Sequence, residues 1–184
     1  MTELSRPVAS STADLRRSKF DRASFSQKPR LPLTVVLDQV RQAYNIGAIF
    51  RLCDAILAES LVVAGVEVDL RKRHLVQAAR GTQHWTPWAQ VDAAEVAVAK
   101  AKADGYQIVV VELASNSIPP EDFVPVFPVC VVLGGERGGV SPAVMKLADA
   151  VIEIPMRGMA NSINVATAAA IVLYSIASRA TPRG

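Results

Sequence analysis

The chain has 184 residues, of which 51% are hydrophobic and 20% are charged, and its net charge is +3. This length and composition predict one folded domain with a sizeable core and exclude a disordered chain. No uninterrupted apolar run reaches roughly 18 residues, and the N-terminus lacks the apolar stretch of a secretory signal. We therefore expect a cytoplasmic protein that does not cross a membrane.

The basic charge is concentrated at the N-terminus. Residues 1–30 contain seven Lys or Arg and three acidic residues, whereas the rest of the chain is slightly acidic. We expect residues 1–30 to form a flexible basic arm and residues 31–184 to form the folded domain. Such an arm is either a contact for a polyanion or a solvated tail, and the charge pattern leaves both interpretations open.

The cysteines and histidines give no sign of a metal site. Cys53 and Cys130 lie in apolar segments without metal-ligand spacing, so they predict buried free thiols. His74 and His84 have no catalytic or metal-binding partner at a characteristic spacing in the sequence. His84 shares a polar loop with Trp85 and Trp88, whose rings either anchor the loop or stack on an unpaired base.

After Pro32 the sequence alternates between strand patterns and helix patterns. In chain order, we expect a strand at 33–37, a helix at 45–57, a strand at 60–65, a short helix with a polar loop within 70–85, a helix at 92–105, a strand at 106–113, a loop at 115–123, a strand at 128–135, a short helix at 141–149, a strand at 150–155 and a closing helix that ends near 178. Asn45 and Asp92 are the predicted N-caps of the first two long helices. Because the strands are continuous apolar runs, they predict an α/β fold with a mainly parallel sheet and helices on both faces.

The closing helix is apolar on nearly all sides. One stripe at helical spacing consists of Val165, Ala168, Ala169, Val172, Leu173 and Ile176, and most of the other face consists of Ala166, Ala170, Ile171 and Tyr174. A helix at the end of a small domain rarely buries both faces within one chain. We therefore predict a homodimer through this helix, and the alternative is a helix that is fully internal.

Glycines and one acid follow the strand at 128–135, in the stretch "LGGERGGVS". Ligands of open α/β sheets bind beyond the carboxyl ends of strands, so a phosphate loop is the first hypothesis. The stretch has no Walker lysine, however, and Glu136 would repel a phosphate at close range. A neutral, zwitterionic or cationic ligand fits better, and the alternative is a tight turn that uses Gly for its dihedral angles.

Two further stretches place polar residues in apolar helices. In "YNIGAIFRLCDA", Arg51 either pairs with Asp54 or points at a phosphate of a nucleic acid. In "IPMRGMANSINVATAAAIVLYSIAS", Ser162 and Asn164 lie where a loop enters the closing helix. Helix capping, by Ser162 above all, is one explanation for these two residues.

In this order, the three stretches resemble motifs of the SpoU/TrmH-type RNA 2′-O-ribose methyltransferases of the SPOUT superfamily, over residues 33–178. "NIGAIFR" is similar to that family's Asn-to-Arg motif, "LGGERGGVS" to G-x-E-x-x-G-[LV]-S, and "IPMRGMANSINVATA" to I-P-M-x-G…S-L-N-V-S. One departure is Ala166, where the family usually has Ser. The missing hydroxyl is expected to cost one hydrogen bond.

The resemblance implies a C-terminal trefoil knot that forms a pocket for S-adenosylmethionine, in a homodimer that includes the last helix. It implies methyl transfer from this cofactor to a ribose 2′-hydroxyl of tRNA or rRNA, without a metal. The cofactor residues that it implies are Gly134, Gly135, Ile154, Met156, Gly158 and Ile163. The catalytic residues that it implies are Asn45, Arg51, Glu136, Ser162 and Asn164.

The same resemblance implies a role for each polar residue. Ser162 and Asn164 would lie between the cofactor and the RNA. The family's motif points to Arg51 as the residue that activates the hydroxyl. A guanidinium is too weak a base to take a proton easily, so we expect Arg51 instead to hold a phosphate and to stabilise developing alkoxide charge. Glu136 would orient Arg51 or Asn45, or accept the proton. The alternatives are a non-catalytic RNA-binding module of this fold and a base-methylating SPOUT enzyme.

Overall fold

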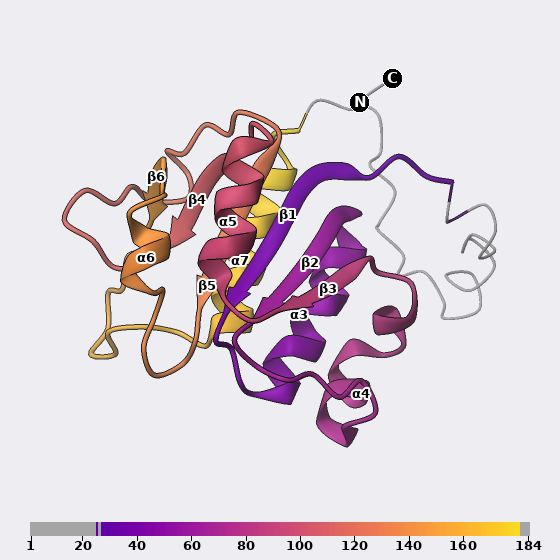
Figure 1. Ribbon diagram of the computed structural model, residues 1–184. Helices are drawn as coiled ribbons and strands as arrows, with labels where there is room; N and C mark the ends of the chain where they lie inside the picture. The colour runs from indigo at the N-terminus through magenta and orange to yellow at the C-terminus, as the bar shows by residue number, and fades with distance from the viewer. Residues whose placement is uncertain (1–24, 26, 181–184) are drawn as a thin grey trace, which may run out of the picture.

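The computed structural model describes Phe25 and residues 27–180 (Figure 1), so the expected basic arm lies almost wholly outside the described residues. The described chain forms a six-stranded sheet in the order β3-β2-β1-β5-β4-β6. The strands are β1 Leu31–Asp38, β2 Ala58–Ala64, β3 Trp88–Val91, β4 Gln107–Val111, β5 Val129–Gly134 and β6 Ala150–Ile152. All neighbouring strands of this sheet run parallel, which confirms the predicted mainly parallel sheet.

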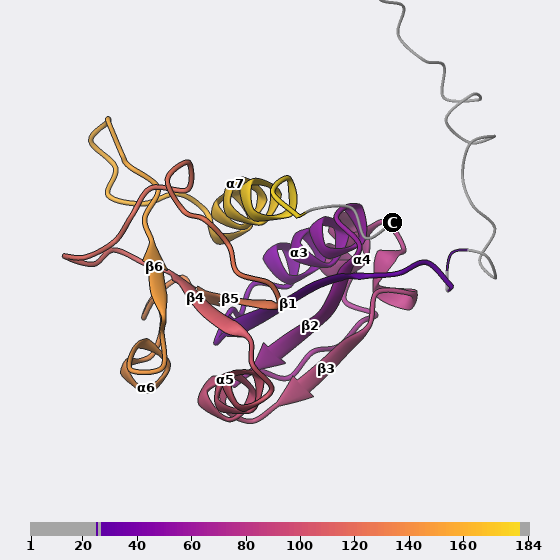
Figure 2. The same cartoon turned by 90° about the horizontal axis from the view of Figure 1, so that it is seen from above.

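Helices cover both faces of this sheet, as the continuous apolar strands predict. The helices are α3 Ala43–Ala55, α4 Arg73–Ala79, α5 Ala94–Ala103, α6 Pro142–Met145 and α7 Val165–Ala177, with a 3-10 turn at Thr82–His84. Figure 2 shows α3, α4 and α7 on one face and α5 and α6 on the other. The buried apolar side chains accordingly form two clusters, one on each side of the strands.

Strand β3 corrects the predicted polar loop around Trp88. Its four residues pair in parallel with β2 at the edge of the sheet. The Trp88 ring packs against Phe50 of α3 in an edge-to-face arrangement, with ring centroids 5.7 Å apart. Trp88 therefore anchors its segment to the core, and this segment is too short to show a strand pattern in the sequence.

The predicted N-caps of two helices are wrong. Helix α3 begins at Ala43 after Gln42, so Asn45 lies inside its first turn, where it is fully buried. Helix α5 begins at Ala94 after Ala93, and no cap bond comes from Asp92. The predicted end of α5 at Gly105 is confirmed, because Gly105 adopts a φ of 85° and its N–H donates to the Lys102 carbonyl.

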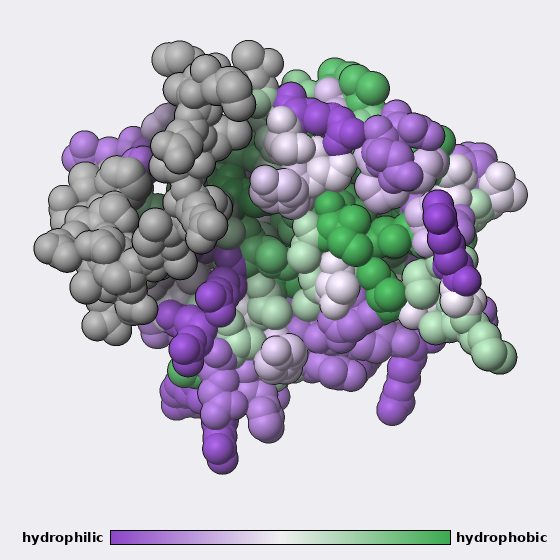
Figure 3. Space-filling view, turned by 180° about the vertical axis from the view of Figure 1, so that it is seen from behind, coloured by the Kyte–Doolittle hydropathy of each residue, from purple (hydrophilic) through white to green (hydrophobic). Residues whose placement is uncertain are grey.

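Helix α7 is buried on one side only. Its Val172, Leu173 and Ile176 are buried, whereas Tyr174 is 72% exposed and Ile171 is 42% exposed. The alternative of a fully internal helix is therefore wrong for the single chain. Figure 3 shows the face covered by α3 and α7, where apolar side chains gather near the middle among polar ones.

The described residues contain no helix that is long and apolar enough to cross a bilayer. They also contain no group of three or more His, Cys, Asp or Glu side chains placed to hold a metal ion. Cys53 and Cys130 are buried free thiols, as predicted, and burial raises the pKa of each to about 12.

Gly47 should tolerate no side chain, although it lies inside a helix. A Cβ at this position would overlap the Leu75 carbonyl oxygen of α4 and lie 3.0 Å from the Ala78 Cβ. Gly-to-Ala changes normally favour helices by about 1 kcal/mol. Here we expect Gly47→Ala to lower the free energy of unfolding by about 1–3 kcal/mol, because the two helices must move apart.

Urea unfolding of the parent protein and of the Gly47→Ala variant measures this loss of stability. Gly138→Ala is the matched control, because a Cβ there meets nothing within 4 Å and its φ is not positive. A Gly47→Ala variant as stable as the parent would show that α3 and α4 do not approach this closely.

Candidate functional site

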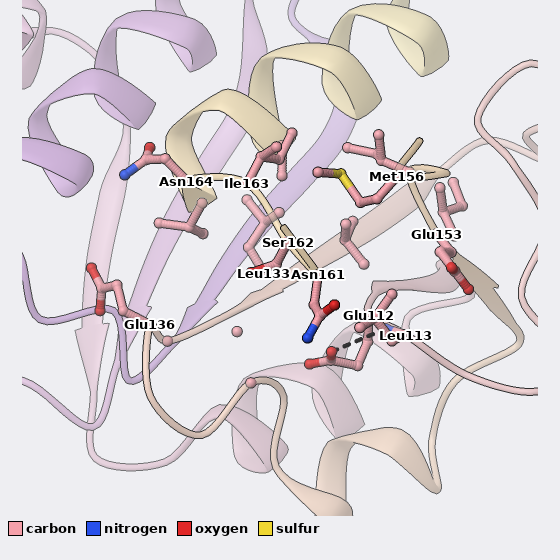
Figure 4. Close-up of a pocket in the computed structure, with 18 of the residues that line it drawn as sticks. Glu112, Leu113, Leu133, Glu136, Glu153, Met156, Asn161, Ser162, Ile163 and Asn164 are labelled. Atoms are coloured by element: carbon pink, nitrogen blue, oxygen red, sulfur yellow. Dashed lines mark hydrogen bonds between the residues drawn. The ribbon is translucent and has the colours of Figure 1, made fainter. Parts of the chain in front are cut away.

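One pocket of about 540 Å³ opens at the carboxyl ends of β4, β5 and β6 (Figure 4). The chain builds β2 and β3 on one side of β1 and the other three strands on the other side. Open α/β sheets bind ligands beyond the carboxyl ends of their strands, and this pocket lies on the side of β1 that carries those three strands. The lining residues are Val111, Glu112, Leu113, Leu133, Gly134, Gly135, Glu136, Arg137, Gly139, Ile152, Glu153, Ile154, Met156, Asn161, Ser162, Ile163, Asn164, Val165 and Ala168.

Most of the residues predicted for the site meet in this pocket. Of the predicted cofactor residues, Gly134, Gly135, Ile154, Met156 and Ile163 line it, and Gly158 does not. Of the predicted catalytic residues, Glu136, Ser162 and Asn164 line it. Asn45 lies behind this lining and Arg51 lies outside it.

Glycine is required in the segment between β5 and α6 because the backbone folds closely on itself and on its neighbours. A Cβ on Gly134 would overlap the backbone of Gly139, and a Cβ on Gly135 would overlap the carbonyl oxygen of Gln39. The Gly139 N–H donates to the Gly135 carbonyl at 3.0 Å, and Gly139 has a φ of 63°. These glycines leave the strand ends open as one wall of the pocket.

A chain of amide and carboxylate groups joins the three motifs. The Asn45 Nδ2 donates to Glu136 Oε1 at 2.7 Å, and the Asn164 Nδ2 donates to Asn45 Oδ1 at 3.0 Å. Because Asn45 is fully buried, these two bonds satisfy a side chain that would otherwise be costly to bury. The geometry therefore fixes the first turn of α3, the glycine segment and the start of α7 relative to one another.

Glu136 is also held by the start of α3. Its carboxylate oxygens accept the backbone N–H groups of Arg41 at 3.3 Å and Gln42 at 3.4 Å. Partial burial works to raise the pKa of Glu136, but its bonds to its own backbone, to Asn45, to Arg41 and to Gln42 outweigh burial and hold the pKa below its ordinary value. Glu136 is therefore an ionised acceptor that binds the N-terminus of a helix.

Asn164, and not Ser162, caps the closing helix. Its Oδ1 accepts the N–H groups of Ala166 at 2.9 Å and Thr167 at 3.4 Å. The predicted capping role of Ser162 is therefore wrong, and its exposed side chain lines the pocket. Ala166 contributes its backbone N–H to the cap, and this contact does not need the hydroxyl that the resembling family usually has there.

Arg51 is exposed on α3, six residues beyond Asn45 and about 9 Å farther along the helix axis. The ion pairs of the described residues do not include a bond between Arg51 and Asp54. Asp54 instead accepts the indole N–H of Trp85 at 2.7 Å. The ion pair between Arg51 and Asp54 that the sequence suggested is therefore not formed. The exposed guanidinium of Arg51 is accessible to a ligand.

Two acidic residues of the pocket were missed in the sequence. Glu112 directly follows β4, and its carboxylate accepts the N–H groups of Leu113 at 3.0 Å and Val140 at 2.9 Å. Glu153 directly follows β6 and accepts the Ser117 hydroxyl at 2.6 Å. Their position just after apolar strands was the available signal, because the carboxyl ends of parallel strands meet at one edge of a sheet.

The pocket suits a small cationic molecule better than a phosphate. Its volume lies within the usual range of small-molecule sites. Its charged lining consists of three carboxylates and one guanidinium, that of Arg137. A sulfonium nucleoside with an amino-acid tail, which is S-adenosylmethionine, fits this size and this excess of negative charge.

The family and the curated relatives agree with this geometry. The model of the SpoU rRNA Methylase family matches residues 32–174. The tRNA (guanosine(18)-2'-O)-methyltransferase of Escherichia coli K12 is 34% identical over 142 residues, which are 77% of this chain and 61% of that protein. The protein of the same name from Aquifex aeolicus is 31% identical over 159 residues, which are 86% of this chain and 74% of that one. The chain thus spans about three fifths of the length of the E. coli relative.

Solved structures share the fold. An AdoMet-bound rRNA methyltransferase from Sinorhizobium meliloti has a TM-score of 0.73 and 28% identity, over 83% of this chain and 61% of that chain. The TrmH/SpoU tRNA modifying enzyme of A. aeolicus has a TM-score of 0.74 and 31% identity, over 84% of this chain and 78% of that chain. With its family match over residues 32–174 and these relatives, the chain belongs to the SpoU rRNA methylase family.

Proposed function

We propose that this chain is an RNA methyltransferase that transfers a methyl group from S-adenosylmethionine to a ribose 2′-hydroxyl of a tRNA or an rRNA. The observation that carries the proposal is the Asn45–Glu136–Asn164 network at the edge of the pocket. Its residues come from the three stretches that resemble motifs of these enzymes. The names of the relatives, which are tRNA and rRNA methyltransferases, support the reaction and the substrate class.

The pocket residues would act mainly by holding the reactants. S-adenosylmethionine, when bound, supplies an electrophilic methyl group. Backbone around Gly134, Gly135, Ile154 and Ile163 would surround it, and Ser162 and Asn164 would lie between it and the ribose. Correct placement of two reacting groups can lower a barrier by roughly 7–11 kcal/mol.

Glu136 is proposed to orient Asn45 and not to accept the proton of the hydroxyl. Both of its oxygens already accept hydrogen bonds, and its lowered pKa makes it a weak base. Arg51 is proposed to hold a phosphate of the RNA, because its guanidinium is exposed on the helix that carries Asn45. A phosphate held there would fix the ribose that follows it.

We propose three further properties as expected from the sequence. The first is a C-terminal trefoil knot, supported by the pocket wall that the glycine segment and residues 152–165 build together. The second is RNA contact by the basic residues 1–30, for which salt-dependent binding that weakens on their removal is the expected behaviour. The third is a cytoplasmic place of action, where tRNA and rRNA are modified.

The reaction predicts a product that resists alkali. Incubation of the protein with labelled S-adenosylmethionine and unmethylated tRNA or rRNA should give labelled dinucleotides that survive alkaline hydrolysis, because a 2′-O-methyl group blocks attack on the next phosphate. We expect Arg51→Ala to lower this transfer at least about a hundredfold, a loss of about 2.7 kcal/mol in transition-state stabilisation, while cofactor affinity stays within about twofold.

The control and the outcomes separate the alternatives. Arg51→Lys keeps the charge without the planar fork, so partial recovery of transfer is expected if the residue holds a phosphate. Equal loss of transfer and cofactor binding in Arg51→Ala would mean a structural role. Label that is sensitive to alkali would indicate base methylation, and binding without transfer would indicate a non-catalytic module.

Acid should remove the contribution of Glu136 to stability. A carboxylate whose pKa is lowered in the folded state stabilises the fold above its ordinary pKa of 4.5 and loses this effect as the pH falls through the folded value. The difference in unfolding free energy between the parent and Glu136→Gln should therefore be constant from about pH 6 to 8 and shrink below the ordinary pKa.

Urea unfolding at several pH values measures this difference. Asp104→Asn is the control, because Asp104 is exposed and pairs with Lys100 far from the pocket. A difference that grows on acidification would contradict the proposed interaction of Glu136 with the start of α3.

We propose a homodimer through α7, supported by the side chains of Tyr174 and Ile171, which are exposed on this largely apolar helix. Tyr174→Asp should raise the dissociation constant of the dimer at least about tenfold, because exposed aromatic residues commonly anchor interfaces. Sedimentation equilibrium measures this change. Val96→Asp, at a position 64% exposed on α5 across the sheet, should have no effect. A parent protein that is monomeric at micromolar concentration would contradict the dimer.

A further inference from the structure

We infer that Glu112 determines the ligand specificity of the pocket, because its carboxylate favours the positively charged methyl donor over the spent product. This inference rests on the proposed function and adds a discrimination between two ligands of the same site. Its basis is the position of Glu112 in the pocket lining and the way its carboxylate is fixed there.

The backbone holds the Glu112 carboxylate in place from two sides. One oxygen accepts the N–H of Leu113 (Figure 4), and the other accepts the N–H of Val140. Gly139 packs so closely that a Cβ there would overlap the second oxygen. These contacts hold the carboxylate in the pocket lining, and Glu112 also links the end of β4 to the glycine segment.

No side chain of the described residues neutralises this carboxylate by an ion pair. The other charged groups of the lining are Glu136, Glu153 and Arg137. Glu136 is engaged with Asn45 and the start of α3, and Glu153 is engaged with Ser117. Figure 4 shows these two acids toward opposite ends of the pocket, with Glu112 facing the space between them.

The donor and the product of methyl transfer differ in charge. S-adenosylmethionine has an ammonium, a carboxylate and a sulfonium group, and so carries one net positive charge. S-adenosylhomocysteine has lost the methyl group and the sulfonium charge, and it is neutral overall. The Glu112 carboxylate therefore attracts one charge in the donor that is absent from the product.

This attraction is strong enough to change ligand affinity because the pocket is small and its charges lie close to any bound ligand. A roughly round cavity of about 540 Å³ is about 10 Å across, so its centre lies about 5 Å from the wall, within the Debye length of about 8 Å at physiological salt. At such separations one charge pair near a protein surface changes affinity by about five- to tenfold. Glu112 would therefore strengthen donor binding by this factor and leave the product free to be replaced.

Calorimetric titration of both compounds without RNA tests the inference. We expect Glu112→Gln to weaken donor binding about five- to tenfold more than product binding. The ratio of the two changes isolates the coupling between Glu112 and the sulfonium charge, as in a double-mutant cycle. Any loosening of the glycine segment by the substitution affects both ligands alike and cancels in the ratio.

The controls separate this inference from the proposed function. Asp104→Asn makes the same chemical change at the other end of the sheet and should leave both affinities as in the parent. Equal changes for donor and product in Glu112→Gln, or no change for either, would overturn the specificity role. Failure of the parent protein to bind either compound would contradict the proposed function itself.

Discussion

The site depends on one buried amide. Asn45 is fully enclosed in the first turn of α3, and it donates to Glu136 and accepts from Asn164. A buried amide that loses a hydrogen-bond partner destabilises a fold by about 1–3 kcal/mol. This cost keeps the three segments together. The two partners have further tasks, since Glu136 binds the N-terminus of α3 and Asn164 caps α7. The fold and the pocket edge are thus stabilised by the same few bonds.

The parallel sheet and the place of the pocket could be predicted from the sequence, because apolar runs and glycines report burial and close backbone approach. The positions of the caps could not. Asn45 looked like a cap because an Asn before an apolar helix usually is one, whereas here its partners come from residues 91 and 119 positions away. Glu112 was missed for a related reason, since its partner Val140 lies 28 positions away. Local sequence patterns do not reveal hydrogen bonds between residues that lie far apart in the chain.

The acidic lining of the pocket would favour binding of a cationic donor but oppose a reaction that removes the donor's positive charge. A carboxylate near a sulfonium stabilises the donor, but that stabilisation is lost as the charge disappears during transfer, which slows the step. In this pocket Glu112 is hydrogen-bonded to the backbone, Glu153 to Ser117, and Glu136 to Asn45, so each carboxylate is held in the lining. Under the proposed function, charges fixed in this way would favour donor binding without moving closer to the donor during transfer. The part of the lining that bonds to Asn45 consists of the neutral Asn164 and the ionised Glu136.

The two tryptophans of the chain both touch α3. Trp85 donates its indole N–H to Asp54, and Trp88 packs against Phe50. An indole that donates to a carboxylate and one that lies against a phenyl ring differ in polarity, so they emit at different wavelengths. The intrinsic fluorescence of the protein therefore reports on the second half of α3, which carries Phe50 and Asp54. Any RNA that shifts the helix would be detectable without a label.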